Sequence, residues 1–175
     1  MDLDNTIYHE LSYLNEVYNS VLNELTYTEK SKELYNIYGN NQIYTRLSKI
    51  YKELDAQYLI QKHREISVAF KPSYLDWAKF VFNCLEETVP IRIITNGNPL
   101  QQKNKIKQLK LLDKFITKEI IYANETKPKP DPKSFESLTT IDKSKECIYI
   151  GDSVVDKMYA HNLNIEYIDV SCISI

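Results

Sequence analysis

The chain has 175 residues, of which 43% are apolar and 26% charged, a composition typical of a soluble globular protein. Its net charge of −2, with acids and lysines mixed along the whole length, predicts neither a nucleic-acid surface nor a disordered acidic tail. No apolar stretch approaches the roughly 18 residues that cross a bilayer, and the acidic start does not resemble a signal peptide. Three widely spaced cysteines favour a reducing cytoplasm over a disulfide framework or a C-x-x-C metal site.

The first half of the chain has the periodicity of helices. Apolar residues recur every three or four positions from about residue 9 to residue 87, which predicts a block of helices. Gly39 is expected to end the second of them, and Ser73 with Asp76 to cap the last. The expected helices lie at residues 11–25, before Gly39, at 43–54, at 57–66 and at 73–85.

After Pro90, short apolar runs alternate with helical segments. Strands are expected at residues 91–94, 119–123, 147–150 and 165–170, and helices at 98–112, 132–139 and 153–161. This alternation predicts right-handed βαβ units around a parallel sheet, that is, an α/β protein with a Rossmann-like core. Ligands of open α/β sheets bind beyond the carboxyl ends of the strands, so the residues that follow each apolar run are the candidates for a site.

Two polar segments of the chain offer groups for phosphate chemistry. Asp2-Leu3-Asp4-Asn5-Thr6 opens the chain, and alternate residues of an extended segment point the same way, so Asp2 and Asp4 can face one site. Thr95-Asn96-Gly97 follows residues 91–94 and offers a hydroxyl and backbone amides to a phosphate near a helix start. Taken alone, the first segment is equally typical of helix caps and the second of a plain strand-to-helix turn.

Two later segments offer a lysine and a pair of acids. The run from Lys127 to Pro132, K-P-K-P-D-P, is stiffened by proline, and it either begins a helix with solvated lysines or holds a lysine against phosphate charge. The run G-D-S-V-V-D follows residues 147–150, and its acids Asp152 and Asp156 lie one helical turn apart. Two such oxygen ligands suit Mg²⁺, although a capped helix with surface acids has the same pattern.

The four segments together are more specific than any one of them. D-x-D-x-T, T-N-G, K-P-x-P and G-D-x-x-x-D, in this order, resemble the motif set of the haloacid dehalogenase (HAD) superfamily, over residues 2 to about 170. The helical block stands between the first and second motifs, where one HAD subfamily carries an inserted helical cap. The resemblance therefore implies an α/β core formed by residues 1–8 and 88–175, and a helical cap formed by residues 9–87.

The resemblance also implies a role for each motif residue. In HAD phosphatases the first aspartate attacks phosphorus and forms an aspartyl-phosphate, while the second protonates the leaving oxygen and later activates water. Carboxylates packed together raise one another's pKa, and a divalent ion with a lysine reverses that effect. The implied residues are Asp2, Asp4, Thr95 and Lys129 for catalysis, Thr95, Asn96 and Lys129 for the substrate phosphate, and Asp2, Asp4 (through its backbone carbonyl), Asp152 and Asp156 for Mg²⁺.

Two lysines compete for the motif-three role. The family pattern is K-P-x-P-x-x-F, and counting from Lys129 places Phe135 at the aromatic position. Counting from Lys127 places Lys133 there instead. The pattern therefore favours Lys129, with Lys127 as the alternative.

The pair of aspartates in the first motif narrows the reaction. HAD dehalogenases keep the nucleophile but lack the second aspartate, so Asp4 favours phosphate chemistry. We expect a cytoplasmic, Mg²⁺-dependent phosphatase that hydrolyses a small phosphorylated metabolite and has no nucleic-acid or membrane partner. A phosphomutase remains an alternative, as does a HAD-fold module with little or no catalysis that binds a partner. The cap, which governs the substrate, carries no recognisable motif, and the sequence predicts no oligomeric state.

The chain departs from the family at its start. HAD proteins carry a buried apolar strand before the first aspartate, whereas only Met1 precedes Asp2. Burying four or five large apolar side chains is worth roughly 6–15 kcal/mol, which is comparable to the stability of about 5–15 kcal/mol of a whole domain. We therefore expect the first core strand to be largely missing and the core to be marginal or rearranged. A chain extended by an apolar run before Asp2 should be more stable and more active; equal melting temperatures and turnover would refute this.

Overall fold

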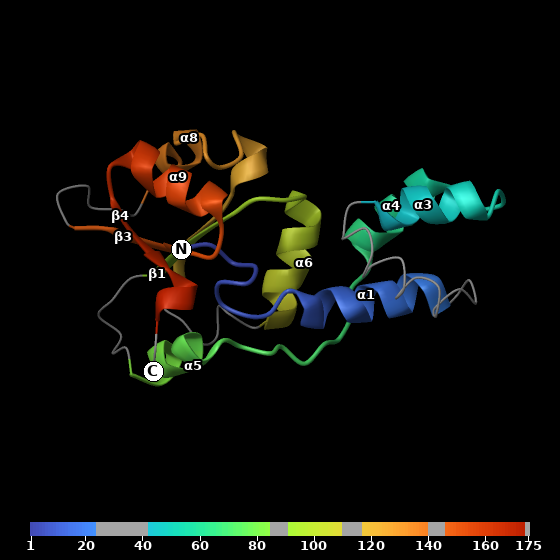
Figure 1. Ribbon diagram of the computed structural model, residues 1–175, viewed down its shortest axis with the longest axis horizontal. Coiled ribbons are helices and arrows are strands. Elements are labelled where there is room, and N and C mark those ends of the chain that lie inside the picture. The colour runs from blue at the N-terminus through green and yellow to red at the C-terminus, as the bar shows by residue number, and fades with distance from the viewer. Residues whose placement is uncertain (24–41, 85–90, 110–116, 140–145, 174–175) are drawn as a thin grey trace. The chain divides into compact units, whose positions relative to one another are not determined.

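The computed structural model describes residues 1–23, 42–84, 91–109, 117–139 and 146–173. The chain forms two compact units (Figure 1). The core unit comprises Met1–Glu10 and Pro72–Ile175, and the helical unit comprises Leu11–Lys71. The helical unit thus begins and ends inside the range 9–87 that the sequence suggested. Within the described residues, no helix combines the length and the apolar character needed to cross a membrane.

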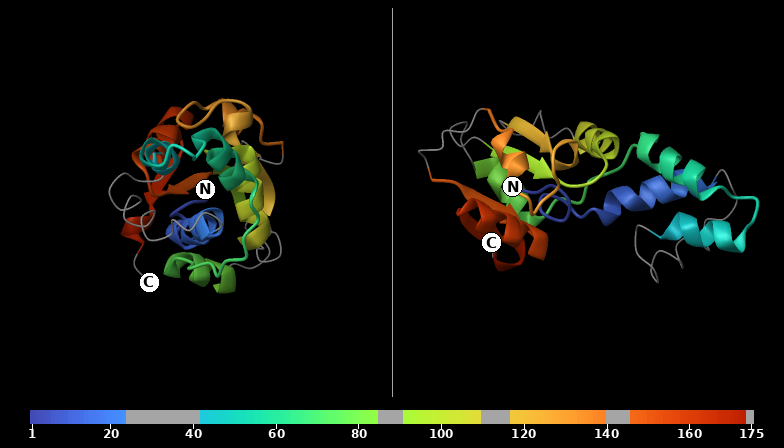
Figure 2. Two further views of the ribbon diagram at one scale, coloured as in Figure 1. Left: turned by 90° about the vertical axis from the view of Figure 1, so that its right-hand side faces the viewer. Right: turned by 90° about the horizontal axis from the view of Figure 1, so that it is seen from above.

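The helical unit contains α1 (Leu11–Asn23), α3 (Ile43–Ile50) and α4 (Ala56–Glu65) among its described residues. Both α1 and α3 pack against α4 (Figures 1 and 2). The third helix ends at Ile50 rather than near residue 54, since the backbone of Tyr51 is extended. Asp55 then caps the start of α4 by accepting hydrogen bonds from two backbone N–H groups. The helix expected before Gly39 lies outside the described residues.

A cluster of rings from all three helices forms part of the interior of the helical unit. Tyr18, Tyr44 and His63 have ring centroids 5.3 to 5.7 Å apart. The hydroxyl of Tyr44 and Nδ1 of His63 lie 2.8 Å apart, so the buried imidazole is hydrogen-bonded. The apolar periodicity of this half of the chain therefore reflects a core of its own.

The last helix of the predicted cap, α5 (Asp76–Cys84), belongs to the core unit. Two hydrogen bonds tie its start to the first motif. The backbone N–H of Leu75 donates to the carbonyl of Ile7, and Nε1 of buried Trp77 donates to the carbonyl of Thr6. The expected boundary near residue 87 is therefore corrected to Lys71, because burial of an aromatic side chain against the first motif outweighs continuity with the preceding helices.

Four parallel strands make up the described sheet structure of the core unit. Strand β1 (Ile91–Thr95) pairs with β2 (Thr117–Tyr122), and β3 (Ile148–Gly151) pairs with β4 (Glu166–Asp169). Each expected strand is present within two residues of its predicted bounds, and the prediction of a mixed α/β fold with parallel strands is confirmed.

The first two residues of the chain connect the two pairs of strands. The amino group of Met1 donates to the carbonyl of Arg92, and the carbonyl of Met1 accepts from the N–H of Ile94. On the other side, the N–H of Asp2 donates to the carbonyl of Ile150. Met1 and Asp2 therefore lie between β1 and β3, where they complete a backbone hydrogen-bond network without forming a strand of their own (Figure 1).

Helices of the core unit follow the strands as the alternating pattern predicts. They are α6 (Pro99–Leu109), η1 (Ala123–Glu125), α8 (Lys133–Glu136), α9 (Val154–Leu163) and η2 (Val170–Cys172). Asn98 caps α6, since its Oδ1 accepts hydrogen bonds from two N–H groups of the first turn. Helix α8 is shorter than the expected 132–139, because its last residues form tighter bonds to the third residue back.

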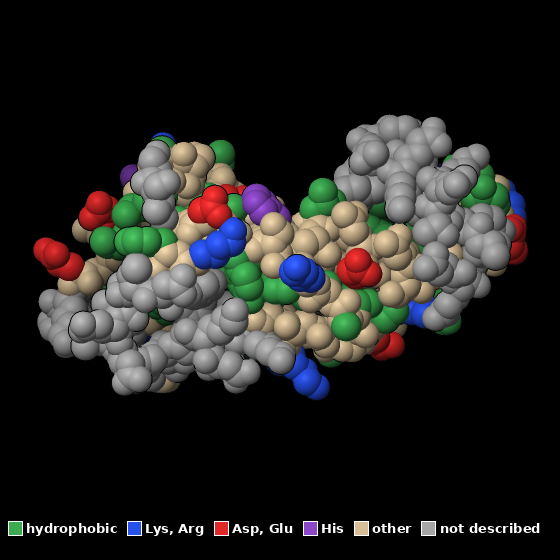
Figure 3. All heavy atoms as spheres, turned by 90° about the horizontal axis from the view of Figure 1, so that it is seen from below, with side chains coloured by type: hydrophobic (Ala, Val, Ile, Leu, Met, Phe, Trp, Pro, Cys, Tyr) green, Lys and Arg blue, Asp and Glu red, His purple; other side chains and the backbone are tan. Residues whose placement is uncertain are grey.

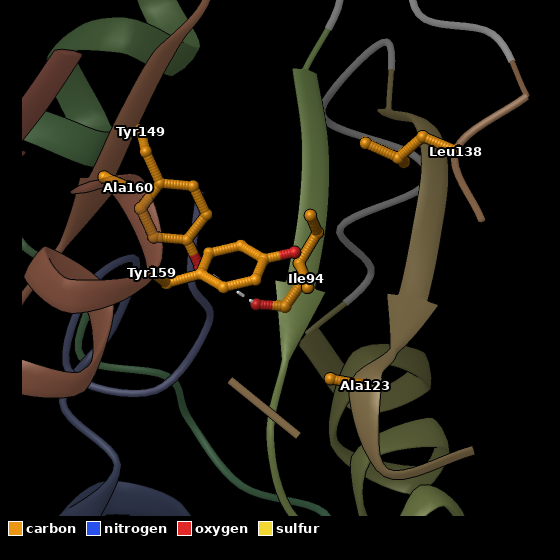
Figure 4. Packing of buried hydrophobic residues seen from close by; sticks show 6 residues of the cluster. All are labelled: Ile94, Ala123, Leu138, Tyr149, Tyr159 and Ala160. Carbon is orange, nitrogen blue, oxygen red and sulfur yellow. Dashed lines mark hydrogen bonds between the residues drawn. The ribbon is translucent and has the colours of Figure 1, made fainter. Parts of the chain in front are cut away.

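The centre of the core unit joins the two pairs of strands through side chains. The rings of Tyr149 and Tyr159, from β3 and α9, meet edge to face at 5.3 Å and lie toward Ile94 of β1 (Figure 4). The buried cluster consists of Ile94, Ala123, Leu138, Tyr149, Tyr159 and Ala160.

On the face shown in Figure 3, acidic and basic side chains of described residues are interspersed rather than gathered by sign.

Candidate functional site

Three carboxylates from opposite ends of the chain converge at the site. Asp2 follows Met1 between the strands, Asp152 comes directly after β3, and Asp156 lies in the first turn of α9. One oxygen from each lies within 4.8 Å of the other two. Asp2 and Asp156 are buried, whereas Asp152 is exposed. The hypothesis that acids from the first and fourth motifs share one site required this proximity.

The motif-three lysine lies among these acids. The ammonium group of Lys129 donates to Oδ1 of Asp2 and to Oδ1 of Asp156, each at 2.6 Å. Its third donor is directed at the hydroxyl of Tyr149, 3.0 Å away. Lys127, in contrast, has an exposed side chain 3.5 Å from Asp131. Of the two candidate lysines, Lys129 is therefore the one whose charge acts on the acid cluster.

The motif-two residues anchor the loop that carries this lysine. The side-chain amide of Asn96 donates to the carbonyl of Lys129 at 3.0 Å, and its Oδ1 accepts from the N–H of Lys129 at 2.8 Å. The Thr95 hydroxyl is buried and donates to the carbonyl of Asn96 at 3.2 Å. Gly97 has φ of +111°, a backbone conformation that favours glycine. Asn96 thus positions Lys129, while phosphate binding by Thr95 and Asn96 stays a prediction.

The motif-four turn positions Asp156 through its own backbone and cap. Ser153 and Asp156 form a reciprocal capping box at the start of α9. A Cβ atom at Gly151 would lie 2.5 Å from Cβ of Asp156, so no larger residue fits there without displacing the acid. The Thr6 hydroxyl, from the first motif, donates to Oδ1 of Asp152 at 3.4 Å. Close packing within the motif-four turn therefore explains the glycine, and the contact between the first and fourth motifs explains the threonine.

The carboxyl group of the second aspartate of the first motif is bound by residues outside the acid cluster. Its Oδ1 accepts from the hydroxyl of Tyr8 at 2.6 Å, and its Oδ2 accepts from Lys105 at 2.8 Å and from Gln102 at 3.0 Å. The side chain of Asp4 is therefore engaged by other partners, as a proton-carrying residue outside the side-chain metal ligands would be. The predicted metal role of its backbone carbonyl stays a prediction.

The charges of the cluster shift the pKa values of its members. Burial raises the pKa of Asp2 from 3.8 to about 7; the Lys129 ammonium opposes this rise and Asp156 adds to it. Burial and the charge of Asp156 also raise the pKa of Asp152. Because the folded-state pKa of Asp2 exceeds the unfolded value, the metal-free fold is expected to lose stability as pH rises from about 4 to about 7.

The donor set fits Mg²⁺. Three carboxylate oxygens within coordination reach of one another are hard ligands, and three ionised carboxylates around the single ammonium group of Lys129 leave an excess of negative charge. A divalent cation would remove this excess. Asp2, Asp152 and Asp156 are therefore the residues that would hold it.

Binding of Mg²⁺ is expected to release protons near neutral pH. Because the pKa of Asp2 is about 7 in the metal-free site, part of this carboxyl is protonated there and must ionise when the cation binds. At about pH 6 we expect up to about one proton released per ion, falling toward zero above about pH 8. Calorimetric titration in buffers of different ionisation enthalpy measures this number; an enthalpy independent of buffer at the lower pH would contradict it.

Several polar residues of the site have no place in the sequence motifs, among them Gln102, Lys105 and Tyr149. Gln102 and Lys105 of α6 are buried on the same face as Ile106 and Leu109, and this spacing of three and four residues was the signal that both face inward. Tyr149 is buried beside Lys129 and also donates to the carbonyl of Ile94. Nothing in an apolar run of the sequence distinguishes such a tyrosine from an ordinary core residue.

Comparison with known proteins shows similarity in sequence family and in fold. The model of the haloacid dehalogenase-like hydrolase family matches residues 1–170. A search of curated proteins gave no match. Among solved structures, a HAD-superfamily hydrolase of subfamily IA, variant 1, from Geobacter sulfurreducens has a TM-score of 0.68 and 16% identity, covering 96% of this chain and 83% of that one.

Two other solved structures have the same fold at low identity. The HAD hydrolase YfnB from Bacillus subtilis, bound to magnesium, has a TM-score of 0.63 and 19% identity, with 95% of this chain and 82% of that one covered. The L-2-haloacid dehalogenase from Xanthobacter autotrophicus has a TM-score of 0.61 and 15% identity, with 99% and 76% covered. The resemblance inferred from the motifs is confirmed: with a family model that spans nearly its whole length, the chain belongs to the haloacid dehalogenase-like hydrolase family.

Proposed function

We propose that this hydrolase is an Mg²⁺-dependent phosphatase that acts on a small phosphomonoester through an aspartyl-phosphate on Asp2. The observation that carries the proposal is the arrangement of the two motif-one aspartates. Asp2 lies with Lys129, Asp152 and Asp156 in one charged cluster, while the carboxyl group of Asp4, two residues on, is held separately. A nucleophile and a separate proton carrier are the two groups that this reaction requires.

The reaction divides into two displacements at phosphorus. A carboxylate oxygen of Asp2 bonds to phosphorus while the bond to the leaving alcohol oxygen breaks, and that oxygen takes a proton from Asp4. A water oxygen then bonds to the same phosphorus, Asp4 takes the proton of the water, and the bond to Asp2 breaks to release inorganic phosphate. Thr95 and Lys129 orient the phosphoryl group, and bound Mg²⁺ supplies charge neutralisation of its oxygens.

Asp4 must be protonated for the first displacement. Burial favours the neutral acid, but the charge of Lys105 and three donated hydrogen bonds outweigh it and lower the pKa of Asp4 in the substrate-free site. A substrate phosphate brings negative charge close to this carboxyl group, which raises its pKa toward the protonated form. Entry of the substrate therefore supplies the condition under which Asp4 serves as an acid.

Dehalogenation is the rival reaction within the family. It needs a carboxylate nucleophile that displaces halide from carbon, and halide leaves without a proton. Asp4, held by three donors at the same site, has no task in that displacement. Its presence therefore favours a phosphate ester, whose leaving oxygen needs a proton, over a haloacid.

The test compares both reactions on the same preparation. We expect hydrolysis of p-nitrophenyl phosphate with Mg²⁺, its loss on addition of a chelator and its return when Mg²⁺ is restored, with no halide released from 2-chloropropionate. Halide release without phosphatase activity would contradict the proposal. A folded protein that binds no Mg²⁺ and hydrolyses neither compound would favour a non-catalytic binding module. Transfer of phosphate to a second sugar phosphate in place of water would favour a phosphomutase.

A further inference from the structure

A second buried lysine lies in the core unit, on helix α6. The side chain of Lys105 is 1% exposed, and its ammonium group contacts two carboxylates: Oδ2 of Asp4 at 2.8 Å and Oε1 of Glu10 at 2.7 Å. Lys129 likewise joins Asp2 to Asp156. Each aspartate of the first motif therefore has a buried lysine of its own, and the motif pattern accounts only for Lys129.

The location of Lys105 is costly unless its partners are retained. An ammonium group loses favourable hydration when it is removed from water, and apolar residues of similar size fill such positions on a helix face without that penalty. Here Lys105 shares the buried face of α6 with Ile106 and Leu109. Stability alone therefore gives little reason for a lysine at this position, whereas its charge acts directly on the carboxyl group of Asp4.

The contacts of Asp4 restrict the direction of its carboxyl group. Tyr8 donates to one oxygen, and Lys105 and Gln102 donate to the other, so rotation about the last side-chain bond would break contacts on both sides. The side chain of Asp4 is still 18% exposed, which leaves it accessible to a reacting group. Glu10 in turn holds Lys105 from the opposite side.

We propose that Lys105, held by Glu10, is a positioning residue that orients the carboxyl group of Asp4 for proton transfer to the leaving oxygen. The inference rests on the proposed function, since Asp4 carries the proton there. Lys105 itself contacts no reacting atom in this scheme. Its removal should weaken proton transfer to the leaving group more than it weakens binding or nucleophilic attack.

Two aryl esters of nearly equal size separate these effects. Phenyl phosphate has a far more basic leaving oxygen than p-nitrophenyl phosphate, so the rate of its hydrolysis depends more on proton donation by a general acid. We expect Lys105→Met to lower kcat for phenyl phosphate at least about tenfold more than for p-nitrophenyl phosphate, with KM changing little for either. Asp4→Asn should show the same selectivity, and adding Lys105→Met to Asp4→Asn should cause no further selective loss.

The matched control is Lys103→Met on the same helix. Lys103 forms an exposed ion pair with Glu125 at 2.9 Å and has no contact with Asp4 among the interactions described. We expect its kcat ratio for the two esters to equal that of the wild type. If Lys105→Met fails to fold, Glu10→Gln replaces it as the test variant. The introduced amide would keep an oxygen acceptor for the Lys105 ammonium group but would lack the negative charge that holds it. We then expect a smaller selective loss of kcat for phenyl phosphate than Lys105→Met would give.

The outcomes distinguish this inference from the function on which it rests. If the wild type hydrolyses both esters but Lys105→Met and Glu10→Gln lose activity on both equally, or not at all, Lys105 is only structural and the inference is overturned. Independent, multiplicative selective losses from Lys105→Met and Asp4→Asn would overturn it as well. If the wild type hydrolyses neither ester with Mg²⁺, the proposed phosphatase function fails, and the role of Lys105 in it fails too.

Discussion

Asp2→Asn is expected to abolish hydrolysis of p-nitrophenyl phosphate, with a loss in kcat of at least about 10⁴-fold. The amide is a poor nucleophile for phosphorus, and it also replaces one of the three carboxylates of the candidate metal cluster. Steady-state kinetics with Mg²⁺ measure the loss. Mass spectrometry of acid-quenched protein should find a phosphoryl adduct on the wild type and none on the variant.

Loss of folding would not account for this result. The pKa of Asp2 is raised to about 7 in the fold, so its ionised form destabilises the metal-free protein above that pH. Asp2→Asn should therefore melt at the same temperature as the metal-free wild type or higher at about pH 8. Asp76→Asn is the control, since Asp76 is exposed and pairs only with Lys79 among the ion pairs described; its kcat should be unchanged. Residual turnover of Asp2→Asn near the wild-type level would reject Asp2 as the nucleophile.

Lys129→Met should have the second-largest effect, on stability as well as turnover. The buried ammonium group joins Asp2 and Asp156, and breaking a buried ion pair of this kind costs about 3–5 kcal/mol. The carboxylates left behind then repel each other. Turnover should fall at least about 100-fold, because positive charge next to the phosphoryl group is lost. Chemical denaturation and steady-state kinetics measure the two effects.

The stability loss of Lys129→Met should depend on pH. Without the lysine, the pKa of Asp2 rises further, so the folded variant keeps this proton to a higher pH than the folded wild type does. Its stability relative to the wild type should therefore fall as pH rises through about 7. Lys127→Met, two residues away and exposed, should be neutral in both measurements. Equal effects of the two substitutions would mean that Lys129 has no special place in the cluster.

The sequence predicted the elements of the core with little error because their signals are local. Short apolar runs bounded by Pro90, Gly97 and Gly151 marked strands and turns, and Asn98 and Ser153 supplied the caps of α6 and α9. Each of these features depends on residues a few positions apart. The order of four motifs along the chain was likewise sufficient to identify the family.

The boundary of the helical unit was harder to predict for the same reason. Helix α5 has the same amphipathic pattern as the helices before it, so periodicity alone placed it with them. Its assignment to the core unit depends on contacts of Leu75 and Trp77 with the first motif, about 70 residues earlier in the chain. Burial against a distant segment leaves no local trace in the sequence.

By itself, the sequence predicted which residues carry the chemistry: two aspartates in the first motif, a lysine in a proline-rich turn and two acids after the third strand of the described core. Only the tertiary structure decided how these charges are paired. It separates the motif-one aspartates, with Lys129 beside Asp2 and Lys105 beside Asp4. The physical reason is that the pairing of buried charges is set by distances between side chains that are far apart in the sequence. The local pattern of an amphipathic helix can show that a lysine faces inward, but it does not show which carboxylate the ammonium group contacts.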